Sequence, residues 1–588
     1  MLRTHKCGQL RADHAGQTVT LCGWVHNLRD FGGAKFIVLR DRWGIVQVTV
    51  APESPESTRR VAEELRDEFV VQVTGLVATR PEGQANPKMA TGEIEIRANS
   101  LVILNRSEVP PFTPSQIETP NEDLRLKYRY LDLRRKGMQD SLLLRHRLVK
   151  SIRDYFDELE FVEVETPILG KSTPEGARDY LVPSRVHPGS FYALPQSPQI
   201  YKQLMMIAGY DRYIQIARCF RDEDLRADRQ PEFTQLDMEM SFVEAEDILT
   251  TIDGLMQRLV RDLRGEELQL PLPRMTYDEA MRRFGHDAPD LRFGMELVDC
   301  THLAAKADFR VFRSVAEAGN KVRGINVKGA AEKFSRKRID ELTTYVQEDF
   351  GAKGLAWFKV EAGTLNSPIA KNFSASLLQE FKQAMGGEDG DMLLFVADTW
   401  EISCKALNGL RRRLGAELQL YDPNQLHLSW VVEFPMFEYD PAEQRWNAMH
   451  HPFTAPRPQD LANLKQAPGD ARAVAYDLII NGFEAGGGTI RIHDASTQQV
   501  VFELLGMDAA TSKDRFGFLL DALSYGAPPH GGIALGVDRL AMLFAGLDNI
   551  RDCIAFPKTA RASDLMSGAP SAVEEKQLKE LSLLLAKK

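Results

Sequence analysis

The densest group of side chains able to hold a charged ligand lies between residues 212 and 242. Two runs typical of β-strands flank a charged break at 224–231, which predicts a hairpin with a long tip. Because strand side chains alternate between faces, one face is apolar and the other carries Arg221, Glu223 and several further carboxylates. A fixed arginine beside carboxylates suits a site that clamps an anion and orients a metal ion or an amine. A solvated, salt-bridged hairpin would show the same alternation.

The overall composition limits the classes of protein to consider. The 588 residues are 43% apolar and 27% charged, and a chain of this length predicts three or four globular domains. With a net charge of −10, any nucleic acid would have to bind local basic patches. We find neither an apolar run long enough to span a membrane nor a signal-peptide pattern at Met1.

Cysteine spacing and glycine motifs narrow the chemistry further. The six cysteines are scattered without a CxxC pair, which argues against a zinc ribbon or a disulfide framework and fits a reducing cytoplasm. The only Gly-Lys pair, Gly170-Lys171, has Glu165 where a P-loop begins with glycine. If the protein binds ATP, a structure other than a P-loop must therefore hold it.

The first 104 residues contain five short runs typical of strands, at 19–26, 36–40, 45–50, 69–78 and 93–104, with a candidate helix at 61–66. This order indicates an OB-fold barrel, which commonly binds single-stranded nucleic acid. Arg29, Phe36 and Gln47 lie near the first strands, where an aromatic ring can stack on a base and polar side chains can read base edges. Alternation alone places Phe36 in the barrel core more readily than on its surface.

Two segments after the barrel carry candidate ligand residues. Glu175 lies in a loop and could hold a substrate ammonium group. Gln199 and Lys202 lie on the first turn of a helix that opens at Pro198. A lysine there is mismatched with the helix dipole, which hints at an anionic ligand.

The second half of the chain again places a cation near a carboxylate. Residues 476–493 predict a pair of strands in which Glu484 and Arg491 flank the glycine run 486–488. A glycine run lets a ligand or another backbone come close. A carboxylate and a guanidinium beside it favour a ligand site.

Two further segments contain candidate site residues. His450 and His451 are adjacent, so on a strand at most one of them would face a site. Residues 531–544 predict a strand, a glycine turn and an apolar helix that contains Arg539.

The remaining segments organise the chain. Residues 105–140 form a connector rich in proline and charge, and 141–167 predict a helix and then a strand that stops at a proline. Residues 290–420 carry strands and helices of their own and predict a separate core. From Ser571 the chain predicts an amphipathic, Leu-rich helix capped by a Ser-x-x-Glu pattern.

Together these strings resemble the class II aminoacyl-tRNA synthetases, and most of all the bacterial aspartyl enzymes. FRDED followed by RQPEFTQLDME resembles motif 2, the unit at 141–167 resembles motif 1, and GIALGVDR resembles motif 3. The resemblance covers the whole chain and implies an α+β multidomain fold, with an N-terminal OB-fold β-barrel, an antiparallel sheet flanked by helices, and an inserted α+β domain. The implied domains are an anticodon-binding barrel at 1–104, a hinge at 105–140, catalytic parts at 141–289 and 421–560, an insertion at 290–420 and an extension at 561–588.

The resemblance also implies which residues bind the substrates. Aspartate would contact Glu175, Gln199, Lys202, Arg221, His450 and Arg491. ATP would contact Arg221, Asp222, Glu223, Gln230, Glu484, Gly536, Val537, Asp538 and Arg539, with Glu484 also a ligand of Mg²⁺. Arg221 and Arg539 would be the catalytic pair. The tRNA anticodon would be read by Arg29, Phe31, Phe36, Gln47 and Gly83.

The reaction implied by the resemblance has two steps in a cytoplasmic homodimer. Aspartate attacks the α-phosphate of ATP to give aspartyl-adenylate and pyrophosphate, and the terminal ribose of tRNA then takes the aspartyl group. Such chemistry needs positioning and charge neutralisation. Two rival interpretations are a tRNA-independent aspartate–ammonia ligase and an OB-fold nucleic-acid-binding protein with an inactive catalytic core. The barrel disfavours the first, and the intact arginines and glutamates disfavour the second.

The choice between tRNA-Asp and tRNA-Asn depends on the barrel. In the resembling family, strict enzymes tend to carry Leu and Lys, and relaxed enzymes His and Gly, at the positions of Phe31 and Gly83. Residues 29–33 and 80–83 are both expected to be loops. Gly83 follows the relaxed pattern and Phe31 follows neither. We therefore expect an enzyme that aspartylates both tRNAs, with a strictly tRNA-Asp-specific enzyme as the alternative.

Overall fold

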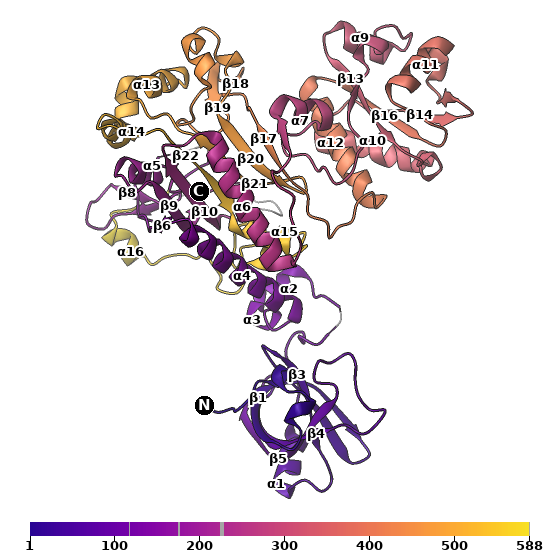
Figure 1. Ribbon diagram of the computed structural model, residues 1–588, viewed down its shortest axis with the longest axis vertical. Helices are drawn as coiled ribbons and strands as arrows, with labels where there is room; N and C mark the ends of the chain where they lie inside the picture. The colour runs from indigo at the N-terminus through magenta and orange to yellow at the C-terminus, as the bar shows by residue number, and fades with distance from the viewer. Residues whose placement is uncertain (117, 174–176, 224–228, 587–588) are drawn as a thin grey trace. The chain divides into compact units, whose positions relative to one another are not determined.

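Figure 1 shows a computed structural model of the chain, which describes residues 1–588 except 117, 174–176, 224–228 and 587–588. The chain divides into two compact units. One contains residues 1–144 and 551–572, and the other contains 145–550 and 573–588. In the described part of the chain, no helix combines the length and the apolar character that crossing a membrane requires.

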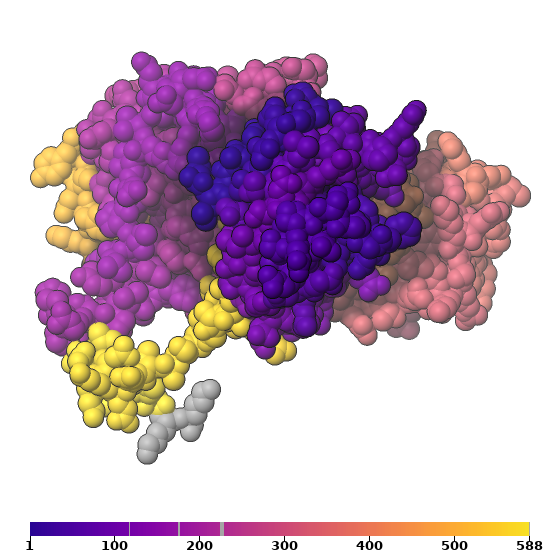
Figure 2. All heavy atoms as spheres, turned by 90° about the horizontal axis from the view of Figure 1, so that it is seen from below, coloured from indigo at the N-terminus to yellow at the C-terminus, as the bar shows by residue number. Residues whose placement is uncertain are grey.

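The N-terminal unit is built on a closed barrel, as predicted. Its strands are β1 (Thr18–Phe31), β2 (Ala34–Asp41), β3 (Gly44–Val50), β4 (Val70–Thr79) and β5 (Ile94–Asn105), in the order β1-β2-β3-β5-β4, with α1 (Glu56–Glu64) after β3. Alternate side chains such as Val19, Leu21 and Val25 fill the barrel. In Figure 2 the barrel residues, in indigo and purple, form one continuous block from which loops project. The short helices α2 (Glu122–Lys127) and α3 (Arg129–Asp132) follow in the same unit.

The loop expected at residues 29–33 is largely strand. β1 continues to Phe31, which pairs with Ala34 of β2. The turn between them is Gly32-Gly33, and both residues have positive φ angles of 64° and 78°. A two-residue hairpin turn of this kind requires such angles, which glycine adopts without steric cost. The side chain of Phe31 therefore lies at the end of the β1–β2 hairpin.

The larger unit is built on an eight-stranded sheet in the order β11-β17-β20-β21-β22-β10-β9-β6. Its strands are β6 (Val162–Glu163), β9 (Arg212–Phe220), β10 (Glu232–Ser241), β11 (Arg274–Thr276), β17 (Leu428–Val432), β20 (Ala475–Ile480), β21 (Phe483–Ile490) and β22 (His530–Gly536). The six inner strands are antiparallel, as predicted, whereas the two edge strands β6 and β11 pair in parallel.

Helices flank this sheet, again as predicted. They are α4 (Lys136–Glu158), α5 (Gln199–Ile207), α6 (Ala245–Arg264), α13 (Ala495–Leu504), α14 (Ala509–Leu523) and α15 (Val537–Phe544). Figure 1 shows α4 and α6 lying alongside each other across the sheet, where Ser151 donates a hydrogen bond to Asp262. Ile152, Phe156 and Leu148 form the buried stripe of α4.

Residues 290–420 fold around a second sheet, in the order β12-β13-β16-β14-β15. Its strands are β12 (Val298–Asp299), β13 (Lys321–Val327), β14 (Ala356–Glu361), β15 (Thr364–Asn366) and β16 (Met392–Asp398), with α8 (Thr301–Ala304), α9 (Arg310–Glu317), α10 (Arg336–Phe350), α11 (Ala375–Ala384) and α12 (Trp400–Glu417), while α7 (Tyr277–Phe284) precedes them. Two apolar clusters pack against it, which explains why this segment carries its own hydrophobic pattern. Two small hairpins, β7 (Leu181–Pro183) with β8 (Phe191–Ala193) and β18 (Phe437–Asp440) with β19 (Arg445–Ala448), complete the strands.

The C-terminal helix predicted from Ser571 is present but short, and the prediction that Ser571 caps it is wrong. The helix α16 covers only Glu575–Glu580, its N-cap is Glu574, and none of its residues is buried. Leu584 and Leu585 lie beyond it and are exposed. Within this helix only Leu578 is partly buried, so few contacts stabilise a longer helix.

Candidate active site

A cavity of about 520 Å³ opens above the inner strands of the large sheet. The predicted residues that line it are Gln199, Lys202, Arg221, Glu223, Gln230, His450, Glu484, Arg491, Gly536, Asp538 and Arg539. Asp222 and Val537 are not among the lining residues, and Val537 is fully buried. Glu175 lies outside the described residues. The hairpin β9–β10, the strands β20–β22 and the helix α5 thus bring together residues more than 300 positions apart.

One part of the cavity is walled by two buried ion pairs. Lys202 Nζ, on α5, lies 3.0 Å from Asp237 Oδ1 and 3.6 Å from Glu239 Oε2. Arg491 donates from Nε and Nη2 to the two oxygens of Glu239, at 2.8 and 3.0 Å. All four residues are at most 1% exposed. Strand alternation places both carboxylates on the cavity face of β10, opposite Leu236 and Met238.

The two carboxylates differ in how they carry their charge. Burial opposes ionisation of Glu239, but Arg491 and Lys202 outweigh it and hold the pKa of this carboxyl below its usual value. Burial dominates at Asp237 and raises its pKa despite the contact with Lys202. Asp237 Oδ2 is also buried and accepts no hydrogen bond from the described residues. It is an acceptor that a ligand with N–H groups could satisfy.

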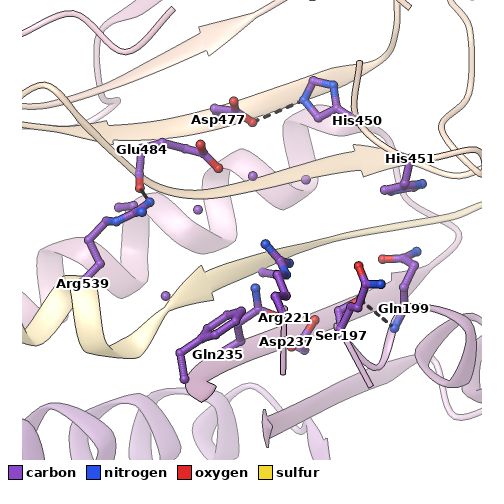
Figure 3. A pocket seen from close by; sticks show the side chains of 18 of the residues that line it. Ser197, Gln199, Arg221, Gln235, Asp237, His450, His451, Asp477, Glu484 and Arg539 are labelled. Atoms are coloured by element: carbon purple, nitrogen blue, oxygen red, sulfur yellow. Dashed lines mark hydrogen bonds and ion pairs between the residues drawn. The ribbon is translucent and has the colours of Figure 1, made fainter. Parts of the chain in front are cut away.

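Another part of the cavity carries two arginines and two carboxylates. Figure 3 shows Arg221 rising from the floor and Arg539 reaching in near Glu484. Arg221 stacks on Phe233 at 5.1 Å from the ring centroid, which limits its freedom. Arg539 donates a hydrogen bond to the backbone carbonyl of Glu484. Both guanidinium groups are therefore positioned before any ligand arrives.

Glu484 faces a second carboxylate, Asp477 of β20. The charge of Asp477, followed by burial, raises the pKa of Glu484. Between them, a Cβ added at Gly487 would lie 2.5 Å from Asp477 Oδ1 and 3.6 Å from Glu484 Oε1, so glycine keeps this space open. Two close carboxylates with room between them fit a divalent cation that completes its shell with water and phosphate oxygens. Among the described residues, no group of three or more His, Cys, Asp and Glu side chains forms a metal site by itself.

The expectation that at most one of His450 and His451 faces a site is wrong, because both line the cavity. β19 ends at Ala448, so the two histidines lie in irregular backbone that does not alternate. His450 Nε2 lies 3.5 Å from Asp477 Oδ1. Burial opposes protonation of His450, but Asp477 outweighs it and raises the pKa. Burial and Arg491, whose Nη1 lies 2.5 Å from His451 Nε2, hold the pKa of His451 well below its usual value.

Asp538 holds three sequence segments together. Its Oδ2 accepts a hydrogen bond from the backbone N–H of Thr234 on β10, at 2.7 Å, and its Oδ1 accepts one from Arg145 on α4. Asp538 is the second residue of α15 and is 2% exposed. Its carboxylate thus fixes α4, β10 and α15, while its neighbours Gly536 and Arg539 border the cavity.

Three of the predicted anticodon residues, Arg29, Phe36 and Gln47, share one face of the barrel. Arg29 pairs with Phe36, and Phe36 pairs with Thr49, which lies two residues from Gln47. Phe36 is only partly buried and is absent from the barrel core, which fills instead with Ile37 and Leu39. The alternative that Phe36 is a core residue is therefore wrong.

The sequence pattern assigns no role to Asp237, Glu239, Asp477 or His451. Asp237 and Glu239 were visible as carboxylates on the polar face of the hairpin, and their pairing with Lys202 and Arg491 could not be read from spacing. Asp477 stands among apolar residues in β20, where a charge is otherwise costly, and this is the signal that would have identified it.

Comparison with known proteins places these features in a family. Residues 121–560 match the model of class II tRNA synthetases (D, K and N), and residues 19–104 match the OB-fold nucleic acid binding domain of the tRNA anticodon type. The chain is similar to an aspartate–tRNA(Asp/Asn) ligase of Rhodopirellula baltica, with 65% identity over 99% of both chains. An aspartate–tRNA ligase of Macrococcus caseolyticus is 52% identical, over 99% of this chain and 98% of the relative.

Solved structures support the same fold at lower identity. Asparaginyl-tRNA synthetase of Pyrococcus horikoshii, complexed with asparaginyl-adenylate, is 20% identical with a TM-score of 0.59, over 95% of this chain and 99% of the other. An aspartyl-tRNA synthetase of Entamoeba histolytica is 18% identical with a TM-score of 0.55, over 95% and 91%. With both its barrel and its catalytic sheet matched, the chain belongs to the class II tRNA synthetases of the D, K and N group.

Proposed function

We propose that this chain is an aspartate–tRNA ligase, which activates L-aspartate with ATP and transfers it to the 3′ end of tRNA. The observation that carries the proposal is the cavity itself, in which two buried cations lie beside one region and two positioned arginines beside another. The full-length similarity to ligases that bear this name supports it. Aspartate-dependent exchange between ATP and pyrophosphate, followed by charging of tRNA, tests it.

Lys202 and Arg491 bind the side-chain carboxylate of aspartate in this proposal. Asp237 and Glu239 hold both cations in place and offset part of their charge. Without aspartate bound, the two cations are therefore not buried without negative partners. Asparagine would leave the two cations without a negative partner in the ligand. A site built on such polar pairing rejects a neutral analogue strongly.

The ammonium group of aspartate needs acceptors on the opposite side. Asp237 Oδ2 is a buried acceptor without a hydrogen bond among the described residues, and Gln199 borders the same space. Glu175 remains a candidate for the same role from its loop. His450 completes the aspartate site in this proposal.

ATP occupies the region of Arg221 and Arg539. As aspartate attacks, negative charge grows on the α-phosphate, and Arg221 stabilises it because its guanidinium is fixed beforehand. Arg539 holds the outer phosphates until pyrophosphate leaves. Glu223, Gln230 and the turn at Gly536 border the nucleotide, whereas Asp222 and Val537 contribute through their backbone or their neighbours.

Mg²⁺ fits between Glu484 and Asp477. The mutual repulsion that raises the pKa of Glu484 would be relieved by a cation between the two carboxylates. When bound, the metal neutralises charge on the phosphates of ATP. His450, beside Asp477, orients that carboxylate.

The barrel reads the tRNA anticodon in this proposal, through the face that carries Arg29, Phe36 and Gln47. We favour an enzyme that charges both tRNA-Asp and tRNA-Asn, because Gly83 presents no side chain and Phe31 is 79% exposed at its hairpin. Two relatives at 65% and 55% identity carry the name aspartate–tRNA(Asp/Asn) ligase. A tRNA-independent ligase would have no use for this face.

We also infer a homodimer that works in the cytoplasm, where charged tRNA is consumed. Large apolar side chains are exposed near the edge strand β6 and its neighbours: Val162, Ile168, Leu169, Tyr210 and Phe242. Such a concentration of exposed apolar surface is typical of a protein interface. Sedimentation velocity of the purified chain tests this inference.

A further inference from the structure

A chain of three buried polar side chains runs from the edge of the cavity into the protein. Gln199 Nε2 donates to Gln203 Oε1 at 3.2 Å, and Gln203 Nε2 lies 3.2 Å from His530 Nε2. His530 Nδ1 lies 2.7 Å from the carbonyl oxygen of Pro528. Gln203 and His530 are fully buried and do not line the cavity, whereas Gln199 does.

The carbonyl oxygen of Pro528 sets the direction of each hydrogen bond in this series. The carbonyl of Pro528 can only accept, so His530 Nδ1 must carry the proton that it receives. Burial lowers the pKa of His530 and keeps the ring neutral, so its Nε2 has a lone pair and accepts. Only the NH₂ group of Gln203 can then face His530, which leaves its Oε1 to face Gln199.

The same constraint passes on to Gln199. Because Gln203 offers an oxygen, Gln199 must turn its NH₂ group inward, and its Oε1 is left on the other side of the amide. Within the described part of the chain, this oxygen has no hydrogen-bond partner, and Figure 3 shows Gln199 at the edge of the pocket with its amide group directed into it. A fixed carbonyl oxygen suits a cation and repels an anion.

We propose that Gln203 and His530 are positioning residues that lock the amide of Gln199 with its oxygen toward the ammonium group of the amino-acid substrate. This inference rests on the proposed function, because it assumes that aspartate occupies the cavity. Without these hydrogen bonds, the amide of Gln199 could rotate by half a turn and present its NH₂ group to the ammonium group. The spacing i, i+4 places Gln199 and Gln203 on one face of α5, and the first residue of β22 supplies the histidine.

The test compares aspartate with succinate, which carries the same two carboxylates but no ammonium group. Pyrophosphate exchange gives the KM of aspartate and ATP, and inhibition gives the Ki of succinate. Gln203→Met and His530→Phe should each raise the aspartate KM roughly tenfold, since a hydrogen bond to a charged group is lost. The Ki of succinate and the KM of ATP should stay within about twofold of wild type.

Two further variants separate orientation from packing. Gln203→Glu, protonated in this buried position, can still donate its O–H to His530 Nε2 and accept from Gln199 on its C=O, so it should hold the aspartate KM near the wild-type value. Met206→Leu, a buried change of similar volume on the same helix, should alter neither constant. Equal increases of the aspartate KM and the succinate Ki would show a structural role of α5, because Lys202 lies on it too, and would overturn the inference. Unchanged constants in both perturbing variants would also overturn it.

Failure of the proposed function would look different. The wild-type protein itself would then show no aspartate-dependent exchange, whatever residue stands at 203 or 530. If wild type is active and only the variants behave contrary to expectation, the orientation of the Gln199 amide is set by something other than the hydrogen bonds that join it to Gln203 and His530.

Discussion

Arg491 and Glu239 form a two-point ion pair beneath the cavity, with N–O distances of 2.8 and 3.0 Å. Glu239 lies on β10, and Arg491 directly follows β21, beyond the inserted residues 290–420. The pair therefore joins the two halves of the catalytic sheet and at the same time holds a cation at the ligand cavity. Because both groups are buried, removing the carboxylate of Glu239 would leave the charge of Arg491 uncompensated.

Removing the carboxylate should therefore destabilise the protein. Glu239→Gln leaves Arg491 half-paired, which costs on the order of 3 kcal/mol and should lower the midpoint of thermal unfolding by at least about 5 °C. Scanning calorimetry measures it. Glu246→Gln breaks an equally close but exposed pair with Arg274 and is the matched control, for which we expect a change of about one degree or less. Equal shifts in the two variants would show that burial of the Arg491 pair adds nothing.

Substitutions in the aspartate site should change the KM of aspartate much more than the KM of ATP. Lys202→Met and Arg491→Leu each remove one cation facing the side-chain carboxylate, so the aspartate KM should rise by roughly 10²-fold or more, against a few-fold change in the ATP KM. Steady-state pyrophosphate exchange measures both. Parallel increases for the two substrates would assign these cations to the architecture of the sheet alone.

Arg221 and Arg539 should act on the rate of adenylate formation. Each contacts charge that develops in the transition state, so Arg221→Ala and Arg539→Ala should each lower the exchange rate by ~10²-fold or more. Arg218→Ala is a control on β9, the strand that precedes Arg221, because Arg218 pairs with Glu232 and does not line the cavity. Rates of the two site variants within a few-fold of wild type would remove these arginines from the mechanism.

The carboxylate pair predicts a pH-dependent requirement for Mg²⁺. Repulsion from Asp477 and burial raise the pKa of Glu484, so a proton competes with the metal at higher pH than for an ordinary carboxyl. Below that pKa, the Mg²⁺ concentration for half-maximal exchange should rise by up to about tenfold per pH unit, and above it the requirement should level off. Because the two groups interact, the proton belongs to the pair.

Glu484→Gln tests this assignment. It should raise the Mg²⁺ requirement at neutral pH by about tenfold or more and flatten its pH dependence, whereas the exposed change Glu503→Gln should do neither. A wild-type Mg²⁺ requirement that stays constant from pH 5 to 8 would contradict a metal between Glu484 and Asp477.

Much of the site was predictable because strand periodicity and glycine turns are local. Alternation in 212–242 placed Arg221 and the carboxylates on one face, and the hairpin β9–β10 has that face. The histidines show the limit of the same rule, since β19 ends two residues before His450 and alternation no longer applies. A strand end is set by tertiary contacts that no local pattern contains.

Contacts between residues far apart in the sequence could not be predicted, for the same reason. Lys202 looked mismatched at the start of α5, and its partner Asp237 is supplied by another element of the fold. The direction of the Gln199 amide depends on Pro528, some 330 residues away. The predicted domain boundaries and the roles of the site residues remain predictions.

The last prediction concerns the choice between tRNA-Asp and tRNA-Asn, whose anticodons differ at one base. Gly83 has a positive φ of 79° and no atom within 4 Å of the position of a Cβ, so the barrel offers open space there. Phe31 lies at the end of the β1–β2 hairpin with its ring exposed, where it can stack on either pyrimidine. Neither feature excludes one base, so we expect kcat/KM for purified tRNA-Asp and tRNA-Asn transcripts to agree within about tenfold.

A paired substitution should narrow this choice. Phe31→Leu together with Gly83→Lys removes the stacking ring and adds a side chain in the open space, and should raise the preference for tRNA-Asp, at some local strain from the positive φ at position 83. Pyrophosphate exchange needs no tRNA and should be unchanged, which separates anticodon reading from the chemistry. A wild-type preference for tRNA-Asp above ~10³-fold, equivalent to about 4 kcal/mol, would show that Phe31 alone enforces strict reading and that the enzyme charges one tRNA only.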